Sequence, residues 1–371
     1  MPLVFTEEQL ELRQAVRRFL DEKSPEIEVR RLMASEQGYD PTVWRQMAEQ
    51  LGLQGLAIPE SYGGSGFTFA ELCIVLEEMG ASLLCAPFFA TVVMAAGTLL
   101  ATDDEDAKGR YLPGIASGDL IGTVALYGDD GRPTLANSSL VARKGPESWL
   151  LDGHKSFVID GHIADLILAV ADTPEGLSLF AVSGSAPGLT RTSLLTMDQT
   201  RKQARLEFGA TPATLIGLAG TAEVPMKTAL ERVAVALANE QVGGAQHCLD
   251  SSVEYAKVRV QFGRPIGSFQ AIKHKCADLL MEIEMARSAA YYAAQVASAD
   301  SDELPAVASL AKSFCSETYT KAASENIQIH GGIGFTWEHG AHLYFKRAKS
   351  SELLFGDPDF HRNLLADEIG I

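Results

Sequence analysis

Residues Arg259–Ile272 read RVQFGRPIGSFQAI and lie between two long stretches of helical sequence. Three residues within this segment favour a turn: Gly263, Pro265 and Gly267. The segment predicts either a plain helix–helix corner or a phosphate-binding corner. Arg259 and Arg264 lie on either side of Phe262, and a guanidinium forms paired charge-assisted hydrogen bonds to phosphate oxygens. Composition alone leaves both interpretations open.

Helical sequence continues on both sides of this corner. Apolar residues with helical spacing predict long helices over residues 226–259, 269–299 and 303–330, and a shorter one over 360–368. Four helices of this kind can close a bundle. We therefore expect a C-terminal four-helix bundle domain at residues 224–371.

Residues 119–223 have a different pattern, in which turn pairs such as Asp152-Gly153 and Pro187-Gly188 separate short β-like runs. The expected strands lie within residues 121–127, 149–151, 157–159, 166–171, 177–182 and 205–208. This pattern of short strands separated by turns is typical of an antiparallel sandwich or barrel. We expect a middle antiparallel β domain over this range.

Residues 1–118 again have a helical pattern. Thr6 and Gln9 form a capping-box pattern before a helix that extends to Lys23. The further helices expected here span residues 41–51, 69–79 and 87–100. Gly80 fits the left-handed position that often follows a helix. The whole chain is thus predicted to be an α+β multidomain protein with an N-terminal α-helical domain.

The composition argues against several functional classes. The 371 residues are 46% hydrophobic and 21% charged, which is typical of a globular protein. A net charge of -17 disfavours nucleic acid and anionic membrane surfaces as partners. The five cysteines have no CxxC or Cys/His ligand spacing, so we expect neither disulfides nor a metal site.

Two features bear on localisation. The N-terminal residues lack the basic and apolar regions of a signal peptide. The most apolar window, residues 87–101, is too short to cross about 30 Å of hydrocarbon. We therefore expect a cytoplasmic protein without membrane insertion.

Glycine-rich nucleotide motifs are absent from the sequence. No GxGxxG follows a predicted strand, and no GxxxxGK[ST] occurs, so Rossmann and P-loop sites have no support. HGGIGF at residues 330–335 follows a helix, and its composition predicts a chain reversal.

Three segments together carry a family resemblance. They are GLAIPESYGGSGFTFAELCIVLEEMG at residues 55–80, RVQFGRPIGSFQAIKHKCADLLMEIEMAR at 259–287, and QIHGGIGFTWEHGAHLYFKRAK at 328–349. The chain resembles the acyl-CoA dehydrogenase family over nearly its whole length. The resemblance implies the same three-domain order, FAD as cofactor, acyl-CoA as substrate, electron-transfer flavoprotein as electron acceptor, and a tetramer built from dimers.

The resemblance also exposes a missing catalytic group. In most of the family a glutamate precedes a glycine in a C-terminal loop and removes the proton α to the thioester; here Phe355 precedes Gly356. In other branches the glutamate lies early in the first bundle helix, where an ungapped match places Val233. The catalytic residue is therefore unknown. Three carboxylates are candidates for a relocated base: Asp357, Glu240 and Glu231.

Positions that surround the flavin ring in the family also differ. ALYGDDGRP at residues 125–133 replaces a segment that carries threonine and serine, and Phe157 and Ile159 replace a tryptophan and a threonine. Asp357 and Asp359 add negative charge, which opposes a pyrophosphate.

Positions that hold the ADP half of a neighbouring subunit's FAD are retained. By resemblance they correspond to six residues: Arg259, Gln261, Phe262, Gln328, Gly331 and Gly332. The chain thus resembles the base-lacking subunit of heteromeric actinobacterial dehydrogenases that act in steroid side-chain breakdown.

Three functions remain open on this basis. The first is one subunit of a heterotetrameric acyl-CoA dehydrogenase, whose companion chain carries the catalytic glutamate. The second is a self-sufficient homotetrameric dehydrogenase with a relocated carboxylate. The third is a non-catalytic acyl-CoA-binding or scaffold protein.

Overall fold

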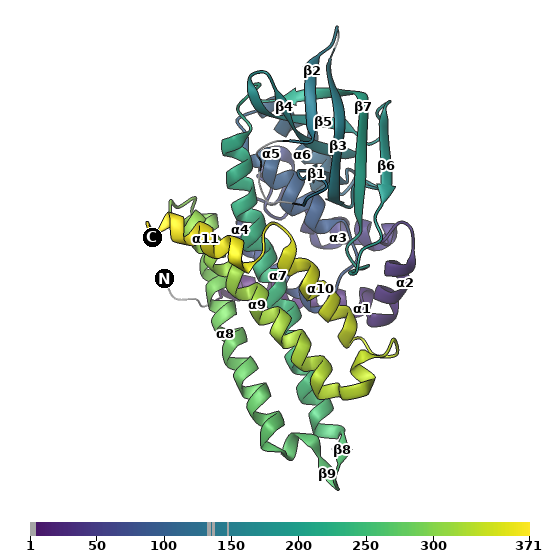
Figure 1. Cartoon of the computed structure of the whole chain (residues 1–371), viewed down its shortest axis with the longest axis vertical. Helices are drawn as coiled ribbons and strands as arrows, with labels where there is room; N and C mark the ends of the chain where they lie inside the picture. Colours follow the sequence, from purple (N-terminus) through teal and green to yellow (C-terminus); the bar gives the residue numbers. More distant parts are fainter. Residues whose placement is uncertain (1–4, 132–134, 136–137, 147) are drawn as a thin grey trace. The chain divides into compact units, whose positions relative to one another are not determined.

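The chain forms two compact units that alternate along the sequence. The computed structural model describes residues 5–131, 135, 138–146 and 148–371 (Figure 1). One unit, which we call the helical unit, extends up to Arg31 and includes Phe69–Leu84 and Ala234–Ile371. The other, the sheet unit, comprises Leu32–Thr68 and Cys85–Val233. The predicted domain boundaries at residues 118 and 223 stay a prediction.

Long helices dominate the helical unit. Its C-terminal part contains α7 (Glu223–Val258, which begins in the sheet unit), α8 (Gln270–Ser298), α9 (Leu304–His330), α10 (Ala341–Leu353) and α11 (Pro358–Glu368). The four predicted helices are confirmed to within a few residues. Helix α10 was not predicted, because the buried polar residues His342, Arg347 and Ser351 interrupt its apolar pattern.

The N-terminal helices of this unit follow the sequence closely. Helix α1 (Glu7–Lys23) begins with the predicted capping box, in which Thr6 Oγ1 accepts from the Gln9 amide at 3.2 Å and Gln9 Oε1 accepts from the Thr6 amide at 3.1 Å. Helix α2 (Glu26–Ala34) follows, and α4 spans Phe69–Ala81. Within the helical unit, α4 packs against α1 and α8.

Small residues fill the core of the bundle. Its buried alanines from α8 and α9 include Ala286, Ala290, Ala293, Ala294, Ala308 and Ala311. A methyl side chain takes little space, so helices can pack closely at these positions.

Glycines allow an even closer approach where α4 meets α7. A Cβ atom on Gly80 would lie 2.0 Å from the carbonyl oxygen of Glu240, and one on Gly243 would lie 1.8 Å from that of Glu77. The prediction that Gly80 ends the helix in a left-handed conformation is wrong. Helix α4 continues through Ala81, and Gly80 is required by this backbone contact.

A closed sheet forms the core of the sheet unit. Its strands are β1 (Gly122–Ala125), β2 (Leu140–Lys144), β3 (Trp149–Ile159), β4 (Leu166–Thr173), β5 (Gly176–Ser183), β6 (Leu189–Ser193) and β7 (Gln203–Ile216). The order is β1-β4-β2-β3-β7-β5, and a further β4–β5 pairing closes the ring. Most pairings are antiparallel as predicted, whereas β4 is parallel to β1 and β2.

The turn predicted at Asp152-Gly153 is wrong. Strand β3 runs through this pair without a break, and the register against β7 shifts between Leu151 and Gly153. Gly153 has φ +129°, and a Cβ there would lie 2.2 Å from the Ser139 carbonyl oxygen. The glycine therefore marks a β-bulge that lets a neighbouring backbone come close. Strands β2 and β6 were not predicted.

Short helices complete the sheet unit. They are α3 (Pro41–Leu51), η1 (Leu53–Gly55), η2 (Glu60–Tyr62), η3 (Phe89–Ala96), α5 (Gly97–Ala101) and α6 (Glu105–Ala116). The helix predicted over residues 87–100 exists, but its first part, η3, is a π-helix. Among the described residues, no helix has the length and apolar composition needed to span a membrane.

The glycine contact between α4 and α7 gives a first prediction. We expect Gly80→Ala and Gly243→Ala to lower the unfolding free energy by about 3 kcal/mol, the upper end for an overpacked core, because each methyl group meets a backbone carbonyl. The control is Gly109→Ala, in an exposed helix position with no atom within 4 Å, which should stabilise by about 0.5–1 kcal/mol. Urea unfolding midpoints of the three variants check this, and equal midpoints would contradict it.

Candidate functional site

The corner between α7 and α8 is a small exposed hairpin. Strand β8 (Val260–Gln261) pairs with β9 (Arg264–Pro265), and a 3-10 turn, η4 (Ile266–Ser268), leads into α8. Phe262 lies at the tip with φ +54° and is 92% exposed. Arg259 and Gln261 are also exposed. The corner therefore presents an aromatic ring and polar groups to solvent.

The two arginines of this corner differ. Arg264 stacks its guanidinium over the Phe269 ring, 4.1 Å from the ring centroid. Within the described part of the chain, no hydrogen bond or ion pair engages the Arg259 guanidinium. Arg259 is therefore the guanidinium of this corner that can bind an anion without first losing a protein contact.

A second corner follows α9. The turn η5 (Gly331–Phe335) starts with Gly331 at φ +65°, and Cβ atoms added to Gly331 or Gly332 would meet no atom within 4 Å. Gln328, in the last turn of α9, is exposed. The predicted chain reversal is present, and its backbone is open to a ligand.

Contacts between the last turns of α7 and α9 hold the two corners near each other. Ser252 Oγ donates to Asn326 Oδ1 at 3.0 Å, and the rings of Tyr255 and His330 stack at 4.2 Å. The structure therefore brings all six predicted cofactor-binding residues to one end of the helical unit.

The positions of the usual base carry apolar, buried side chains. Phe355 is 7% exposed with φ +60°, and Val233 is 2% exposed. Neither has a group that can accept a proton.

The three candidate carboxylates lie in different surroundings. Asp357 is exposed and caps α11, where its Oδ1 accepts from the Phe360 amide at 2.8 Å. Glu240 is buried, and its Oε1 pairs with Arg347 Nη1 at 3.0 Å. The third candidate, Glu231, is half-buried on α7. A relocated base among them stays a prediction.

The positions matched to the flavin ring lie in the sheet unit. Ile159 is 2% exposed and has no polar side-chain atom, and the Phe157 ring packs against Gly131. Of the segment 125–133, Arg132 and Pro133 lie outside the described residues. The structure thus offers no hydroxyl at position 159.

A polar cluster that sequence reasoning missed lies beside this segment. Asp129 pairs with Arg205, contacts His154 at 3.1 Å, and accepts from Ser156 Oγ at 2.5 Å. The hydroxyl of Ser156, together with the nearby His154 and Arg205, lowers the pKa of Asp129. Asp129 lies in a turn, whereas its partners lie on β3 and β7, so no local pattern signalled the cluster.

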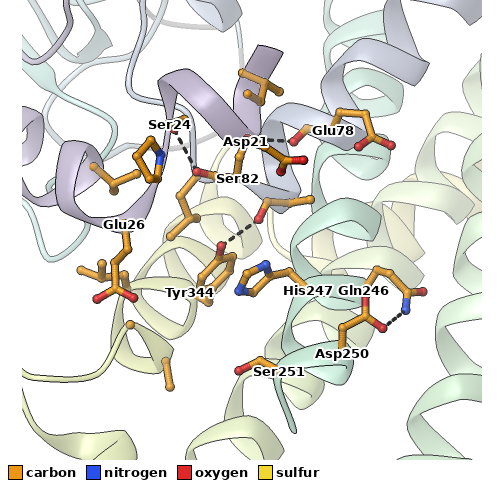
Figure 2. Close-up of a pocket in the computed structure, with 18 of the residues that line it drawn as sticks. Asp21, Ser24, Glu26, Glu78, Ser82, Gln246, His247, Asp250, Ser251 and Tyr344 are labelled. Atoms are coloured by element: carbon orange, nitrogen blue, oxygen red, sulfur yellow. Dashed lines mark hydrogen bonds between the residues drawn. The ribbon is translucent and has the colours of Figure 1, made fainter. Parts of the chain in front are cut away.

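A pocket of about 520 Å³ lies in the helical unit (Figure 2). The labelled residues include the carboxylates of Asp21, Glu26 and Asp250. On one side His247 stacks on Tyr344 at 4.1 Å. Burial lowers the pKa of His247, although Asp250 opposes this. The pocket walls come from helices far apart in sequence, so no local sequence pattern indicated the pocket.

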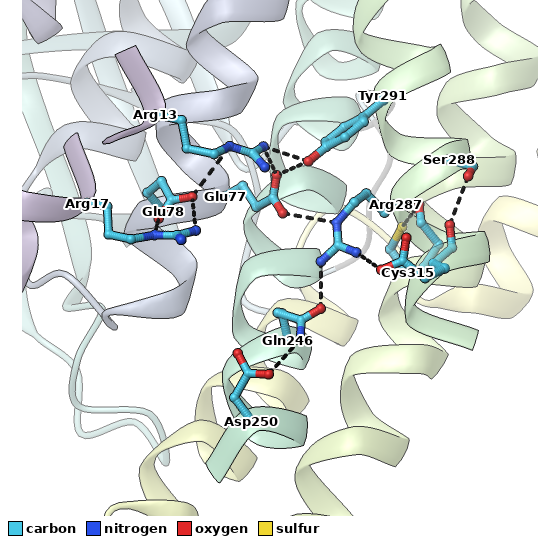
Figure 3. A network of polar contacts seen from close by, with 12 residues as sticks. Arg13, Arg17, Glu77, Glu78, Gln246, Asp250, Arg287, Ser288, Tyr291 and Cys315 are labelled. Carbon is cyan, nitrogen blue, oxygen red and sulfur yellow. Dashed lines mark hydrogen bonds and ion pairs between the residues drawn. The ribbon is translucent and has the colours of Figure 1, made fainter. Parts of the chain in front are cut away.

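A network of buried charges lies on α4 (Figure 3). Glu77 accepts from Arg13 at 2.6 Å, from Arg287 at 3.3 Å and from the Tyr291 hydroxyl. Glu78 forms two bonds of 2.8 Å with Arg17. Each carboxylate is satisfied by cationic partners, so the network is structural.

A buried lysine lies beside the turn that contains Phe355. Lys312 of α9 is fully buried, and its Nζ donates to Ser316 Oγ at 3.0 Å, to the Glu352 carbonyl at 3.1 Å and to the Gly356 carbonyl at 3.0 Å. Burial lowers the pKa of Lys312 to about 7. The sequence held a signal for it, since Lys312 lies on the same helical face as the apolar Ala308 and Cys315.

Comparisons with known proteins agree with the fold. Family models described as the N-terminal and the C-terminal domain of acyl-CoA dehydrogenase match residues 6–119 and 222–370. The chain is 39% identical to the acyl-CoA dehydrogenase IpdE2 of Mycobacterium tuberculosis, over 95% of this chain and 94% of that protein.

Two solved structures of heteromeric enzymes are similar to it. One is a variant of the Tcur3481-Tcur3483 steroid acyl-CoA dehydrogenase, with a TM-score of 0.89, 31% identity, and 98% of each chain covered. The other is the ChsE4-ChsE5 complex of Mycobacterium tuberculosis, with a TM-score of 0.90, 29% identity, and 100% of this chain and 99% of that chain covered.

The pKa of Lys312 gives a second prediction. Because it falls from 10.5 to about 7 on folding, the unfolded chain binds more protons between these pH values. The wild-type chain should therefore gain unfolding free energy relative to Lys312→Met as the pH rises from about 7 to about 10, by up to about 1.4 kcal/mol per pH unit. Below pH 7 the difference should be constant. Denaturant unfolding across this range measures it.

The matched control is Lys321→Met, on the surface of the same helix, where the side chain is 49% exposed. Its unfolding free energy should run parallel to that of the wild-type chain. A parallel profile for Lys312→Met as well would contradict the lowered pKa.

Proposed function

The chain belongs to the acyl-CoA dehydrogenase family, and we propose that it is one subunit of an FAD-dependent acyl-CoA dehydrogenase whose active site a second, similar chain completes. The similarity to two heteromeric dehydrogenases supports this arrangement. The reaction would be α,β-dehydrogenation of an acyl-CoA thioester.

One observation carries the proposal. The side chains of the corner are exposed, and the Arg259 guanidinium has no partner among the described residues. The two positions of the catalytic base, in contrast, hold the buried apolar residues Phe355 and Val233. A chain with this combination can help to hold a cofactor but lacks the usual group for proton abstraction.

The residues present fit one half of FAD and not the other. The open backbone at Gly331 and Gly332 admits a close ligand, and Arg259 and Gln328 offer donors to a pyrophosphate, with Phe262 available to an adenine edge. At Ile159 the hydroxyl partner of the flavin ring is missing. This chain would therefore hold the ADP half of an FAD whose ring lies in the companion chain.

Each part of the chemistry can then be assigned. FAD, when bound, accepts the hydride from the β carbon of the acyl group. A carboxylate of the companion would remove the α proton. The residues of this chain would anchor the cofactor through Arg259 and Gln328, while Phe355 would present an apolar surface.

The substrate and the acceptor are proposed at the level of class. The steroid acyl-CoA dehydrogenase among the similar structures supports a bulky, steroid-derived acyl group. Electron-transfer flavoprotein is the proposed acceptor, and the cytoplasm the proposed location.

The decisive prediction concerns the isolated chain. We expect the purified chain to bind little FAD and to oxidise acyl-CoA poorly with a dye acceptor, because a positioned base contributes about 10²- to 10⁴-fold to the rate. Co-expression with its companion should give a yellow, active complex. Turnover of about 1 to 10³ per second by the isolated homo-oligomer would contradict the proposal in favour of a relocated base. A colourless protein with every companion tested would favour a scaffold.

A separate prediction tests the cofactor corner. In the assembled complex, Arg259→Ala should weaken FAD binding roughly ten- to a hundredfold, because a charge-assisted hydrogen bond contributes about 1.5–3 kcal/mol. The control is Arg264→Ala at the same corner, whose guanidinium is engaged by Phe269, and it should retain FAD. Flavin content after dialysis is the measurement, and equal retention by the two variants would refute the role of Arg259.

A further inference from the structure

The two cofactor corners carry large apolar side chains that face solvent. Phe262 is 92% exposed, Phe335 81% and Trp337 61%. Three aliphatic residues of the same corners are also exposed: Val258, Val260 and Ile333. We call these six residues the corner patch. Several exposed aromatic groups at one end of a folded unit mark a binding surface.

Two of the three aromatic rings of the corner patch are held in place by neighbours. Lys346 Nζ lies 4.2 Å from the centroid of the Trp337 ring, and the His342 ring meets this ring edge to face at 4.7 Å. The Phe262 ring meets the Phe269 ring edge to face at 6.1 Å. A side chain that is already fixed loses little conformational entropy when a partner covers it. The rings are therefore prepared for contact with another protein.

An apolar groove of about 470 Å³ begins beside the corner patch and runs between α7 and α8. Its apolar lining comes from both helices and comprises Leu249, Val253, Ala277 and Leu280. Lys257, one turn before the corner, lies at one end of it. Met281 and Met285, on the neighbouring surface of α8, are exposed, and methionine adapts to the shape of a partner. The corner patch thus continues into a groove that can receive apolar side chains.

The exposed area matches the needs of a stable interface. An aromatic side chain buries about 150–250 Å² when it is covered, so the three exposed rings supply roughly 350–600 Å². A stable interface buries about 800 Å² on each partner. The aliphatic residues of the corner patch and the walls of the groove supply the remainder.

The charge of this end argues for a partner other than a second copy. Residues 255–277 contain no carboxylate, although the whole chain has a net charge of -17. Their five cationic side chains are Lys257, Arg259, Arg264, Lys273 and Lys275. Two copies that met end to end would bring these cations together, whereas an acidic surface of a different chain would be attracted.

We propose that the corner patch and the groove between α7 and α8 form the surface that binds the companion chain, through a face of that chain with an apolar centre and acidic groups around it. The inference rests on the proposed function, in which the companion holds the flavin ring while this corner holds the ADP half. The companion must then come within one cofactor length of the corner. The surface is large enough to bind the companion before FAD is present.

Binding affinity between the two chains tests the surface. The companion is the chain that gives a yellow, active complex on co-expression, and it is then prepared without flavin. Phe335→Ser and Trp337→Ser should each weaken its binding about tenfold or more, as is typical for a central aromatic residue, both with and without added FAD. The control is Ile27→Ser, a 73% exposed position on α2 of the helical unit, which should bind like the wild-type chain.

Three results of this measurement would overturn the proposal. The first is equal affinity for the wild-type chain and both aromatic variants. The second is a loss of affinity that occurs only with FAD present, because the aromatic residues would then act through the cofactor. The third is an equal loss for Ile27→Ser, which would remove the assignment to this end.

A further variant tests the groove and keeps the test decisive if Trp337→Ser fails to fold. Leu280 is 48% exposed, so Leu280→Asp should leave the unfolding midpoint of the isolated chain nearly unchanged. Its carboxylate would lie in an apolar groove and face an acidic companion, so binding should weaken about tenfold or more. Unchanged binding would overturn the groove as part of the surface.

Failure of this proposal can be told apart from failure of the proposed function. A yellow complex whose affinity is the same with Phe335→Ser, Trp337→Ser and Leu280→Asp would overturn the docking surface alone. If no chain gives a yellow complex, the proposed function is wrong, and sedimentation of the isolated chain then identifies the occupant. A homodimer that Phe335→Ser dissociates would show that a second copy covers this surface, which would overturn the companion as its partner.

Discussion

The close contact between α4 and α7 is the constraint on which the helical unit depends. Gly80 and Gly243 allow the two backbones to meet, and the residues that they face are Glu240 and Glu77. The carboxylate of each glutamate also binds arginine side chains of other helices. Glu77 binds Arg13 of α1 and Arg287 of α8, and Glu240 binds Arg347 of α10. One crossing thereby fixes the relative positions of five helices.

Buried charge makes this arrangement specific rather than merely stable. A carboxylate taken out of water loses several kcal/mol of solvation, which only well-placed partners offset. Glu77 and Glu240 find such partners in the packing produced by the glycine contact. Helices shifted along one another would leave these charges unpaired. Two of these helices, α7 and α8, flank the corner that carries Arg259, and α10 leads into the turn at Phe355, so the positions of both depend on the crossing.

Much of the fold was predictable from sequence because it rests on local patterns. The long helices α7, α8 and α9 follow their apolar periodicity, and the capping box at Thr6 and Gln9 marks the start of α1. The wrong predictions occur where contact with a backbone segment distant in sequence determines the local conformation. Gly80 and Gly153 have turn-like sequences, yet each is required by a carbonyl group from another segment.

The residues of the candidate site likewise divide into those that the sequence indicated and those that it did not. The six corner residues stand in two recognisable motifs, so the resemblance could point to them. The contacts of Lys312 depend on three-dimensional neighbours, and the sequence indicated only the burial of Lys312, through its place on the same helical face as Ala308 and Cys315. The cluster at Asp129 and the pocket beside His247 are assembled from segments far apart in the chain, which no single-sequence pattern reveals.

The closed ring of the sheet unit has a consequence for how the chain behaves at high concentration. Because β4 pairs with both β2 and β5, the ring, as far as the described residues form it, has no long open edge at which another chain could add a strand. Strand β6 pairs with β7 on one side, and it is short and carries Thr190, Arg191 and Thr192. Polar and cationic side chains on a short outer strand discourage edge-to-edge aggregation. The sheet unit is thus protected from the strand addition that leads to β-rich aggregates.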